Sequence, residues 1–275
     1  MKDCREEWYD KDAKVAVTIV DVTSAAQELA RGHLAGPTSA HFLTEALASV
    51  ALLGAEMSEK DETVILQMKC KGPLGGFNVE CTSEGTLRGY AEKKVLDDFD
   101  GLGKPDARKV IGDAQYQVTR SVPGRILSQG ISTSIDGYLA GSLQRKACIR
   151  TEVAVSDEVE VLEARGVMVE VLPDSKIGSL GSAGTEEVKV PLLSLSDTKG
   201  PIHLSVASRN ILKQLGLENA ELRKTTPLKF ACRCSPDRAI AMLAALSEEE
   251  RAALPPTIDI TCHMCGKTFT VKTKE

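Results

Sequence analysis

The segments LKFACRC (228–234) and ITCHMCG (260–266) decide how the carboxyl-terminal part of this chain is organised. They hold four of the eight cysteines, with the spacing C-x-C, 27 intervening residues and C-x-x-C. Four thiolates are the ligand set of a closed tetrahedral zinc site, and the intervening loop is long enough for both pairs to meet one ion. We therefore expect one zinc ion bound by Cys232, Cys234, Cys262 and Cys265. An iron–sulfur cluster is the main alternative for four thiolates.

The residues around the cysteines predict a small module that depends on its metal. Alternation of apolar residues and cysteines at 228–234 predicts a strand edge with both sulfur atoms on one side. The Ser-Pro pair at 235–236 predicts the start of a helix, and Ser247 with Glu250 forms a capping box for a second one. The last segment, 258–271, is typical of strand, metal knuckle and strand. A unit of this size buries too little apolar surface to fold without the metal.

The first two-thirds of the chain mix strand and helix patterns. Strands are predicted by alternation or by β-branched runs at 15–22, 116–122, 148–155 and 166–173, the last apolar enough to be buried on both faces. The segment 64–81 predicts a hairpin with the turn GPLGG, which turns Cys70 and Cys81 inward. Helices are predicted after Gly36-Pro37, with one apolar stripe, and at 131–143.

The composition changes after Pro173, where the Gly/Ser-rich stretch 174–187 predicts a domain boundary. Short amphipathic pieces follow, notably SVASRNILKQLG at 205–216, and helices this short are marginal alone. We therefore expect an α+β protein in three parts. These are a mixed α/β amino-terminal domain at 1–176, a conditionally folded helical linker at 177–227 and a small zinc-binding domain at 228–275.

Composition and charge exclude several classes of function. The net charge is −5 and no Lys/Arg-rich block occurs, which disfavours a nucleic-acid partner. The longest near-apolar run, 46–55, is much shorter than the roughly 20 residues that span a bilayer. The charged start lacks the apolar core of a secretory signal. We expect a cytoplasmic protein in a reducing compartment, or one in an organellar matrix if a transit peptide directs it there.

The remaining polar candidates do not form a catalytic set, so we expect no enzyme. His263 lies between two of the four cysteines and is interpreted as a solvent-facing spacer, with an alternative role as a ligand. Cys148 falls on a strand face shared with Arg150 and Glu152, so it is interpreted as an exposed but incidental thiol. Structural or incidental roles are expected for a further group: Cys4, Cys70, Cys81, His33, His41 and His203.

The chain resembles the heat shock protein 33 family of redox-regulated chaperones. The resemblance is strongest over 228–271, where FACRCS and ITCHMCG match the family's C-x-C and C-x-x-C signature and the length between them. It extends to the hairpin LQMKCKGPLGG, to LRGYAE around Arg88-Gly89-Tyr90 and to RGVMVEVLP. These motifs together span nearly the whole chain.

The resemblance implies an ATP-independent holdase of the stress response that is inactive while reduced and zinc-bound. Oxidation would join the cysteines within each pair as disulfides, release zinc, unfold the linker and expose a surface for unfolding client proteins. A homodimer in the oxidised state is compatible with it, and neither nucleic acid nor membrane is an implied partner. In an extended strand, Cα atoms at i and i+2 lie roughly 6.6 Å apart, so Cys232 and Cys234 would bridge only with bending.

A static zinc ribbon that binds other molecules, including nucleic acid, is the alternative function. The only aromatic residues of the module are Phe230 and Phe269, and acids alternate with its basic residues, which disfavours that interpretation. A zinc hydrolase is less favoured still, because four cysteines leave no open coordination position.

Overall fold

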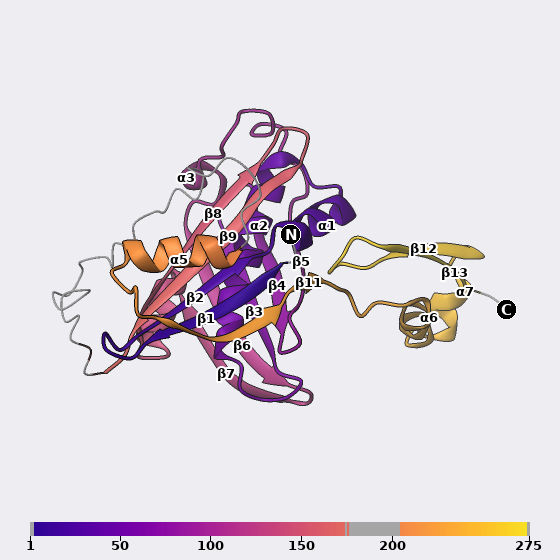
Figure 1. Cartoon of the computed structure of the whole chain (residues 1–275). Coiled ribbons are helices and arrows are strands. Elements are labelled where there is room, and N and C mark those ends of the chain that lie inside the picture. Colours follow the sequence, from indigo (N-terminus) through magenta and orange to yellow (C-terminus); the bar gives the residue numbers. More distant parts are fainter. Residues whose placement is uncertain (1–2, 174, 176–203, 274–275) are drawn as a thin grey trace.

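The computed structural model of the chain describes residues 3–173, 175 and 204–273 (Figure 1). Most of the described strands belong to two sheets. The first is a five-stranded antiparallel sheet of order β10-β1-β2-β9-β8. Its strands are β1 (Cys4–Asp10), β2 (Val15–Asp21), β8 (Lys146–Val155), β9 (Val161–Val171) and β10 (Glu221–Pro227).

The second sheet has six strands in the order β11-β5-β4-β3-β6-β7. All of its pairings are antiparallel except that of β11 with β5. Its strands are β3 (Thr63–Cys70), β4 (Gly76–Thr82), β5 (Thr86–Ala91), β6 (Ala114–Val122), β7 (Arg125–Ser132) and β11 (Lys229–Phe230). The expected hairpin is confirmed, because Leu66 of β3 pairs with Val79 of β4.

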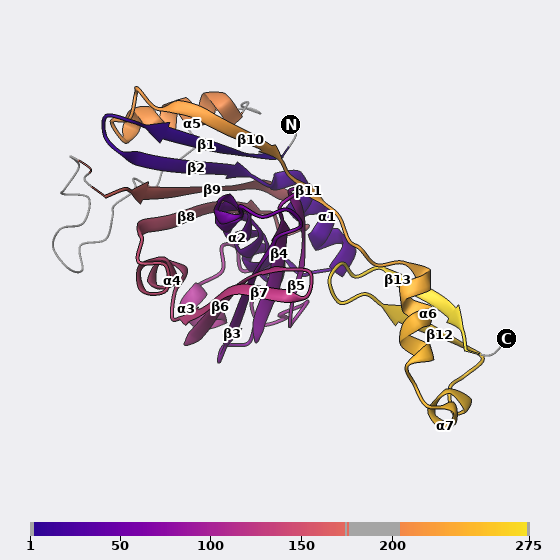
Figure 2. The same cartoon turned by 90° about the horizontal axis from the view of Figure 1, so that it is seen from below.

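Helix α2 (Pro37–Leu53) lies between the two sheets (Figure 2). Gly36 precedes it in an extended conformation and Pro37 takes the first helical position, as the sequence predicts. In place of one apolar stripe, 15 of its 17 residues are buried, because sheets cover the helix on opposite sides. Helix α1 (Thr23–His33) packs beside α2, and short helices follow as η1 (Gly54–Glu56), α3 (Ala107–Val110) and α4 (Ile135–Gly141).

Helix α5 (Leu204–Gln214) covers the face of the five-stranded sheet that points away from α2 (Figure 2). Ile211 and Leu212 of this helix, with Leu217 and Ala220 after it, are buried in an apolar cluster. We call this the cover cluster; its sheet residues are Trp8, Val15, Val17, Ile19, Cys148, Val167 and Val169. Strand β10 follows α5 and pairs with the edge strand β1. Residues 221–227 are therefore extended, whereas the sequence predicted a helical linker there.

The structure places the charged start in a sheet and corrects two further expectations. The start forms β1 of the five-stranded sheet, where the buried Arg5 donates to the carbonyl of Ala51 and to the Glu7 carboxylate. The helix expected at 131–143 begins only at Ile135, and Ile131 belongs to strand β7. Cys148 is buried rather than exposed, because α5 covers its face of the sheet.

The carboxyl-terminal module has the elements that its sequence predicts. Ser235 caps α6 (Pro236–Ala244) by accepting from the Arg238 amide, and Ser247 and Glu250 form the capping box of α7 (Glu248–Ala252). Strands β12 (Thr257–Thr261) and β13 (Thr268–Lys272) form the hairpin that carries the knuckle. The buried apolar cluster of the module has only three members, Ala239, Leu243 and Val271. So small a core fits a fold that needs another stabilising element.

Among the described residues, no helix is both long enough and apolar enough to cross a bilayer.

Candidate metal centre

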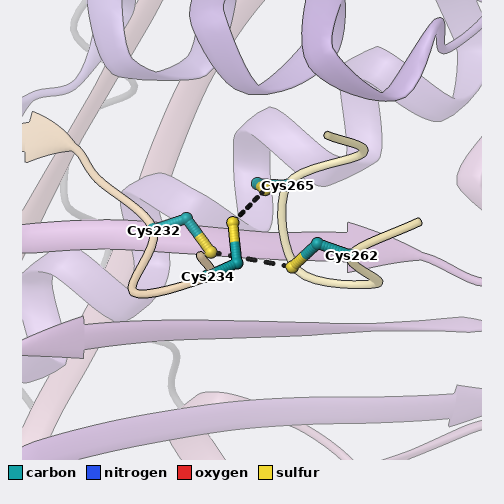
Figure 3. A group of neighbouring side chains, drawn as sticks. All are labelled: Cys232, Cys234, Cys262 and Cys265. Carbon is teal, nitrogen blue, oxygen red and sulfur yellow. Dashed lines mark hydrogen bonds between the residues drawn. The ribbon is translucent and has the colours of Figure 1, made fainter. Parts of the chain in front are cut away.

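The structure brings the four predicted cysteines together at one point (Figure 3). Cys232 and Cys234 lie in the irregular segment between β11 and α6, and Cys262 and Cys265 lie in the knuckle between β12 and β13. All four sulfur atoms lie within 4.8 Å of one another. The Sγ atoms of Cys232 and Cys262 are 3.7 Å apart, and those of Cys234 and Cys265 are 3.5 Å apart. Sulfur atoms from both ends of the module therefore surround a common point.

The sulfur positions fit a tetrahedral metal site. With zinc–sulfur bonds of about 2.3 Å, tetrahedral geometry separates the sulfur atoms by about 3.8 Å. The Cys232–Cys262 and Cys234–Cys265 separations, 3.7 and 3.5 Å, are close to that edge length, and the other pairs lie within 4.8 Å. Soft sulfur ligands in this geometry suit zinc better than magnesium or calcium. Zinc bound here would hold the two halves of the module together and keep the thiolates ionised.

The ionisation of the thiols also favours a bound cation. Burial opposes ionisation of Cys232, but hydrogen bonds from the Arg88 guanidinium and the Cys234 backbone outweigh it and lower the pKa of the Cys232 thiol to about 7. Burial raises the pKa of Cys234 and that of Cys265, and the sulfur atoms of Cys232 and Cys262 raise both further, whereas a hydrogen bond with Cys265 lowers the pKa of Cys234. Without a cation, at most one of these three thiols ionises readily near neutral pH. A divalent ion would supply the charge that allows several thiolates at such short range.

Strand β11 is shorter than the sequence predicts. It pairs with β5 only at Lys229 and Phe230, and one further bond joins the Ala231 amide to the carbonyl of Leu87. Cys232 and Cys234 follow the strand in irregular backbone, so the expectation that both lie on a strand edge is wrong. After Ala231 the chain leaves the sheet, and this path brings the sulfur atoms of Cys232 and Cys234 to the knuckle. The Cα separation of an extended strand therefore does not describe this pair.

The knuckle packs directly on the core. The Gly89 amide of β5 donates to the carbonyl of Met264 over 3.1 Å. At the end of α1, a Cβ atom on Gly32 would lie 2.6 Å from the Cys265 carbonyl oxygen. Gly266 has φ +74, and a Cβ atom there would lie closer still to the Gly32 carbonyl oxygen. The backbones of the two segments thus meet without a side chain between them.

The other candidate residues lie outside the sulfur cluster. His263 is exposed, as expected for a spacer, and its ring meets that of Tyr90 edge-on with centroids 4.4 Å apart. His33 is buried, and its Nε2 lies 2.8 Å from the carbonyl oxygen of Gly89. Cys81 is fully buried and Cys70 half-buried in the core, as expected. The other three are placed as follows: Cys4 is half-buried in β1, His41 is buried beside Glu45 in α2, and His203 falls outside the described residues.

Sequence reasoning missed the core residues that touch the cysteines. Arg88 of β5 donates to Cys232 Sγ over 3.5 Å and pairs with Glu80 of β4. The segment LRGYAE contains Arg88, Gly89 and Tyr90, but nothing in its pattern indicates contact with cysteines more than 140 positions further on. Only the assembled fold places β5 beside the metal module.

A closed set of four thiolates on a module docked to an α+β core defines a protein with a non-catalytic, zinc-site-like centre, because no ligand position is open to a substrate. A family model described as "Hsp33 protein" matches residues 7–272. The chain belongs to the Hsp33 family of redox-regulated chaperones, which are zinc-binding holdases and not enzymes.

Relatives and a solved structure agree with this assignment. A "33 kDa chaperonin" of Thermus thermophilus is 29% identical, and the match covers 94% of this chain and 81% of the relative. A "33 kDa chaperonin" of Symbiobacterium thermophilum is 26% identical, with coverage of 92% and 88%. The crystal structure of the 33 kDa chaperonin of Thermotoga maritima has a TM-score of 0.79. It is 20% identical and matches over 99% of this chain and 96% of that one, so the two share a fold.

Proposed function

We propose that this chain binds one Zn²⁺ through Cys232, Cys234, Cys262 and Cys265 while reduced, and becomes an ATP-independent holdase when these cysteines are oxidised. Its clients are unfolding proteins. The observation that carries the proposal is the cover cluster, an apolar sheet face hidden by α5 alongside the strand that leads to the cysteines. The domain boundaries at 176 and 227, the cytoplasmic location and a homodimer in the oxidised state belong to the same proposal.

Helix α5 is held to the sheet by few residues. A helix of 11 residues is marginal alone, so α5 depends on the cover cluster for its stability. One buried polar contact adds to it, because Ser208 of α5 and the Trp8 indole both donate to one Glu6 carboxylate oxygen, over 2.6 and 3.1 Å. The Arg209 guanidinium also lies over the Trp8 ring, 5.3 Å from its centroid. Losing these contacts would expose Trp8 and the aliphatic residues of the sheet together.

The path from the metal to α5 runs through β10. Its side chains are mostly exposed, Thr226 being the buried one, so the strand is held chiefly by its pairing with β1. At its end, the Leu228 amide donates to the Asp3 carbonyl and the Lys229 amide to that of Gly85. These anchors are next to the cysteines. Unfolding of the metal module would therefore loosen β10 from its end, and α5 is attached to the other end of β10.

A direct test measures aggregation of a chemically unfolded client with the reduced protein and with the same protein after peroxide and mild heat. Suppression only after oxidation supports the holdase. Equal behaviour of the two forms would favour the static zinc ribbon instead.

The reactivity of the Cys148 thiol can report whether α5 covers its face of the sheet. Burial raises the pKa of the Cys148 thiol to about 11, so in the covered state it is a thiol at pH 8 and alkylates slowly. Once uncovered, its pKa falls toward the ordinary value of about 8.5, and the labelling rate at pH 8 rises by roughly two orders of magnitude. The rate should then level off above about pH 9 in the uncovered state and continue to rise with pH in the covered state.

Cys81 is the matched control for this labelling, because it is fully buried in the other cluster and burial raises its pKa to about 11 as well. Peptide-resolved iodoacetamide labelling of the oxidised, desalted protein should modify Cys148 and spare Cys81. If Cys148 stays as protected as Cys81 in a client-binding sample, α5 does not leave the sheet.

We expect the two cysteine pairs to oxidise in order, Cys262 with Cys265 first. The knuckle is already a turn, with the Gly266 amide bonded to the Cys262 carbonyl over 2.9 Å, so a C-x-x-C bridge needs little rearrangement. Cys232 is held to the core by Arg88, and a C-x-C bridge closes a smaller ring. Peroxide alone should give mainly the first disulfide, and added heat should give both. Mass-spectrometric thiol mapping over time decides this, and early formation of the Cys232–Cys234 bridge in folded protein would contradict it.

A further inference from the structure

Glu80 and Arg88 form a buried ion pair at the edge of the core that faces the metal module. They are directly opposite each other on β4 and β5, and Arg88 Nε lies 2.5 Å from Glu80 Oε1. Their side chains are only 8% and 14% exposed, so each charge needs a partner of opposite sign. The pairing also fixes the plane of the guanidinium, because Nε is committed to the carboxylate.

The free end of the same guanidinium reaches the metal centre. Arg88 Nη1 donates to Cys232 Sγ over 3.5 Å. Arg233, which lies between the two cysteines of the C-x-C pair, donates to the same Glu80 oxygen over 2.9 Å. Glu80 thus orients Arg88 and also holds the backbone segment that carries Cys232 and Cys234. Glu80, Arg88, Cys232 and Arg233 form a closed ring of contacts, and Cys232 is its member in the sulfur cluster.

The next two residues of β5 contact the other cysteine pair. Gly89 donates to the Met264 carbonyl within the knuckle, and the Tyr90 ring meets that of His263. Three consecutive residues of the core therefore touch both halves of the sulfur cluster. Such an arrangement fixes the position of one half relative to the other.

We propose that Arg88, oriented by Glu80, is a positioning residue for the metal centre, so that the amino-terminal core supplies part of the outer contacts that retain the metal. The inference rests on the proposed binding of zinc by the four cysteines. A hydrogen bond to a coordinated thiolate holds the sulfur in its ligating direction and offsets part of its negative charge. Loss of outer contacts of this kind typically weakens metal binding by about 10- to 100-fold.

The chain contains a matched ion pair that does not contact the cluster. Arg120 Nε on β6 lies 2.6 Å from Glu62 Oε1, and Glu62 is fully buried. Strand β6 is separated from β5 by β3 and β4 in the same sheet. Arg120→Met therefore breaks a comparable buried pair and destabilises the same sheet, without removing a donor from a sulfur atom.

The test uses the full-length reduced protein loaded with zinc. The rate of zinc transfer to a chromogenic chelator is measured for the wild type, Arg88→Met and Arg120→Met. Arg88→Met should release zinc about 10-fold faster or more. Arg120→Met should stay within about twofold of the wild type. Arg88→Lys keeps the charge but has a single nitrogen, so it cannot bond the carboxylate and the sulfur through separate nitrogens of a planar group. Its rate of zinc release should therefore lie between those of the wild type and Arg88→Met.

A second readout separates positioning from simple stability. In the cobalt-substituted protein, the thiolate-to-cobalt charge-transfer band reports the donor strength of the sulfur atoms, so Arg88→Met should shift this band and Arg120→Met should leave it unchanged. If Arg88→Met does not fold, Glu80→Gln keeps the arginine and removes the charge that orients it. That variant should show faster release and a band shift in the same direction.

Equal release rates for Arg88→Met and Arg120→Met, or an unshifted cobalt band in a folded Arg88 variant, overturn the proposal. These outcomes leave zinc binding by the cysteines intact. Failure of the wild type to retain any zinc would instead overturn the proposed metal site, and the role of Arg88 with it.

Discussion

Replacement of Cys232, Cys234, Cys262 and Cys265 together by serine is expected to reduce the zinc content of the purified protein from about one ion per chain to nearly none. Serine hydroxyls are poor zinc ligands, and structural zinc contributes on the order of 10 kcal/mol to the folding of small modules. The apolar core of this module has three buried members, which cannot replace that contribution. The module should therefore unfold, while the two-sheet core stays folded around α2.

Metal analysis and hydrogen exchange measure both parts of this expectation. Amides of β12 and β13 should lose protection, and those of α2 should keep it. A matched control replaces Cys4, Cys70, Cys81 and Cys148 by alanine, which leaves all four sulfur atoms of the cluster in place. Stoichiometric zinc in the first variant would refute the assignment of the ligands.

The second large effect is expected from Ile211→Asp in α5. Ile211 is 2% exposed in the cover cluster, and placing a carboxylate there loses the apolar burial and leaves a charge without solvent. The cost is roughly 4 kcal/mol or more, which exceeds what a short helix can absorb and stay docked. We expect α5 to leave the sheet and the protein to suppress client aggregation without any oxidant.

The Ile211→Asp variant separates detachment of α5 from release of zinc, because its zinc content should remain at one ion per chain. Lys213→Asp is the control: Lys213 is exposed on the same helix, so an aspartate there leaves the cover cluster intact. The Lys213→Asp variant should stay inactive until oxidised. If Ile211→Asp also stays inactive while α5 is shown by hydrogen exchange to be detached, the client-binding surface lies elsewhere.

Local signals in the sequence predicted local structure well. The caps at Ser235 and Ser247, the proline at the start of α2 and the β3–β4 hairpin are set by residues within a few positions of one another. The convergence of the four cysteines also followed from their spacing, because few arrangements satisfy four thiolates at once.

Features that depend on distant partners could not be predicted in this way. The charged residues Arg5 and Glu6 give no strand pattern, yet both are buried in β1, where Ala51 and Ser208 complete their hydrogen bonds. Cys148 was expected to be exposed because its strand face also carries charged residues, and α5 covers it from far along the chain. The contact of Arg88 with Cys232 joins positions 144 apart. Such pairs become visible only when topology is known.

The direct contact between the backbone of Gly32 and the knuckle should make the response of the protein to oxidant all-or-none in each molecule. Two backbones in direct contact, with no flexible side chain between them, cannot separate by small steps and still keep their packing. A gap of about 0.5–1 Å already loses a quarter to a half of the dispersion attraction while it is still too narrow for water, so partly separated positions are unfavourable. Molecules should therefore have the knuckle either fully docked on the core or fully released from it, with few in between. More oxidant would then increase the fraction of released molecules and not the extent of release in each one.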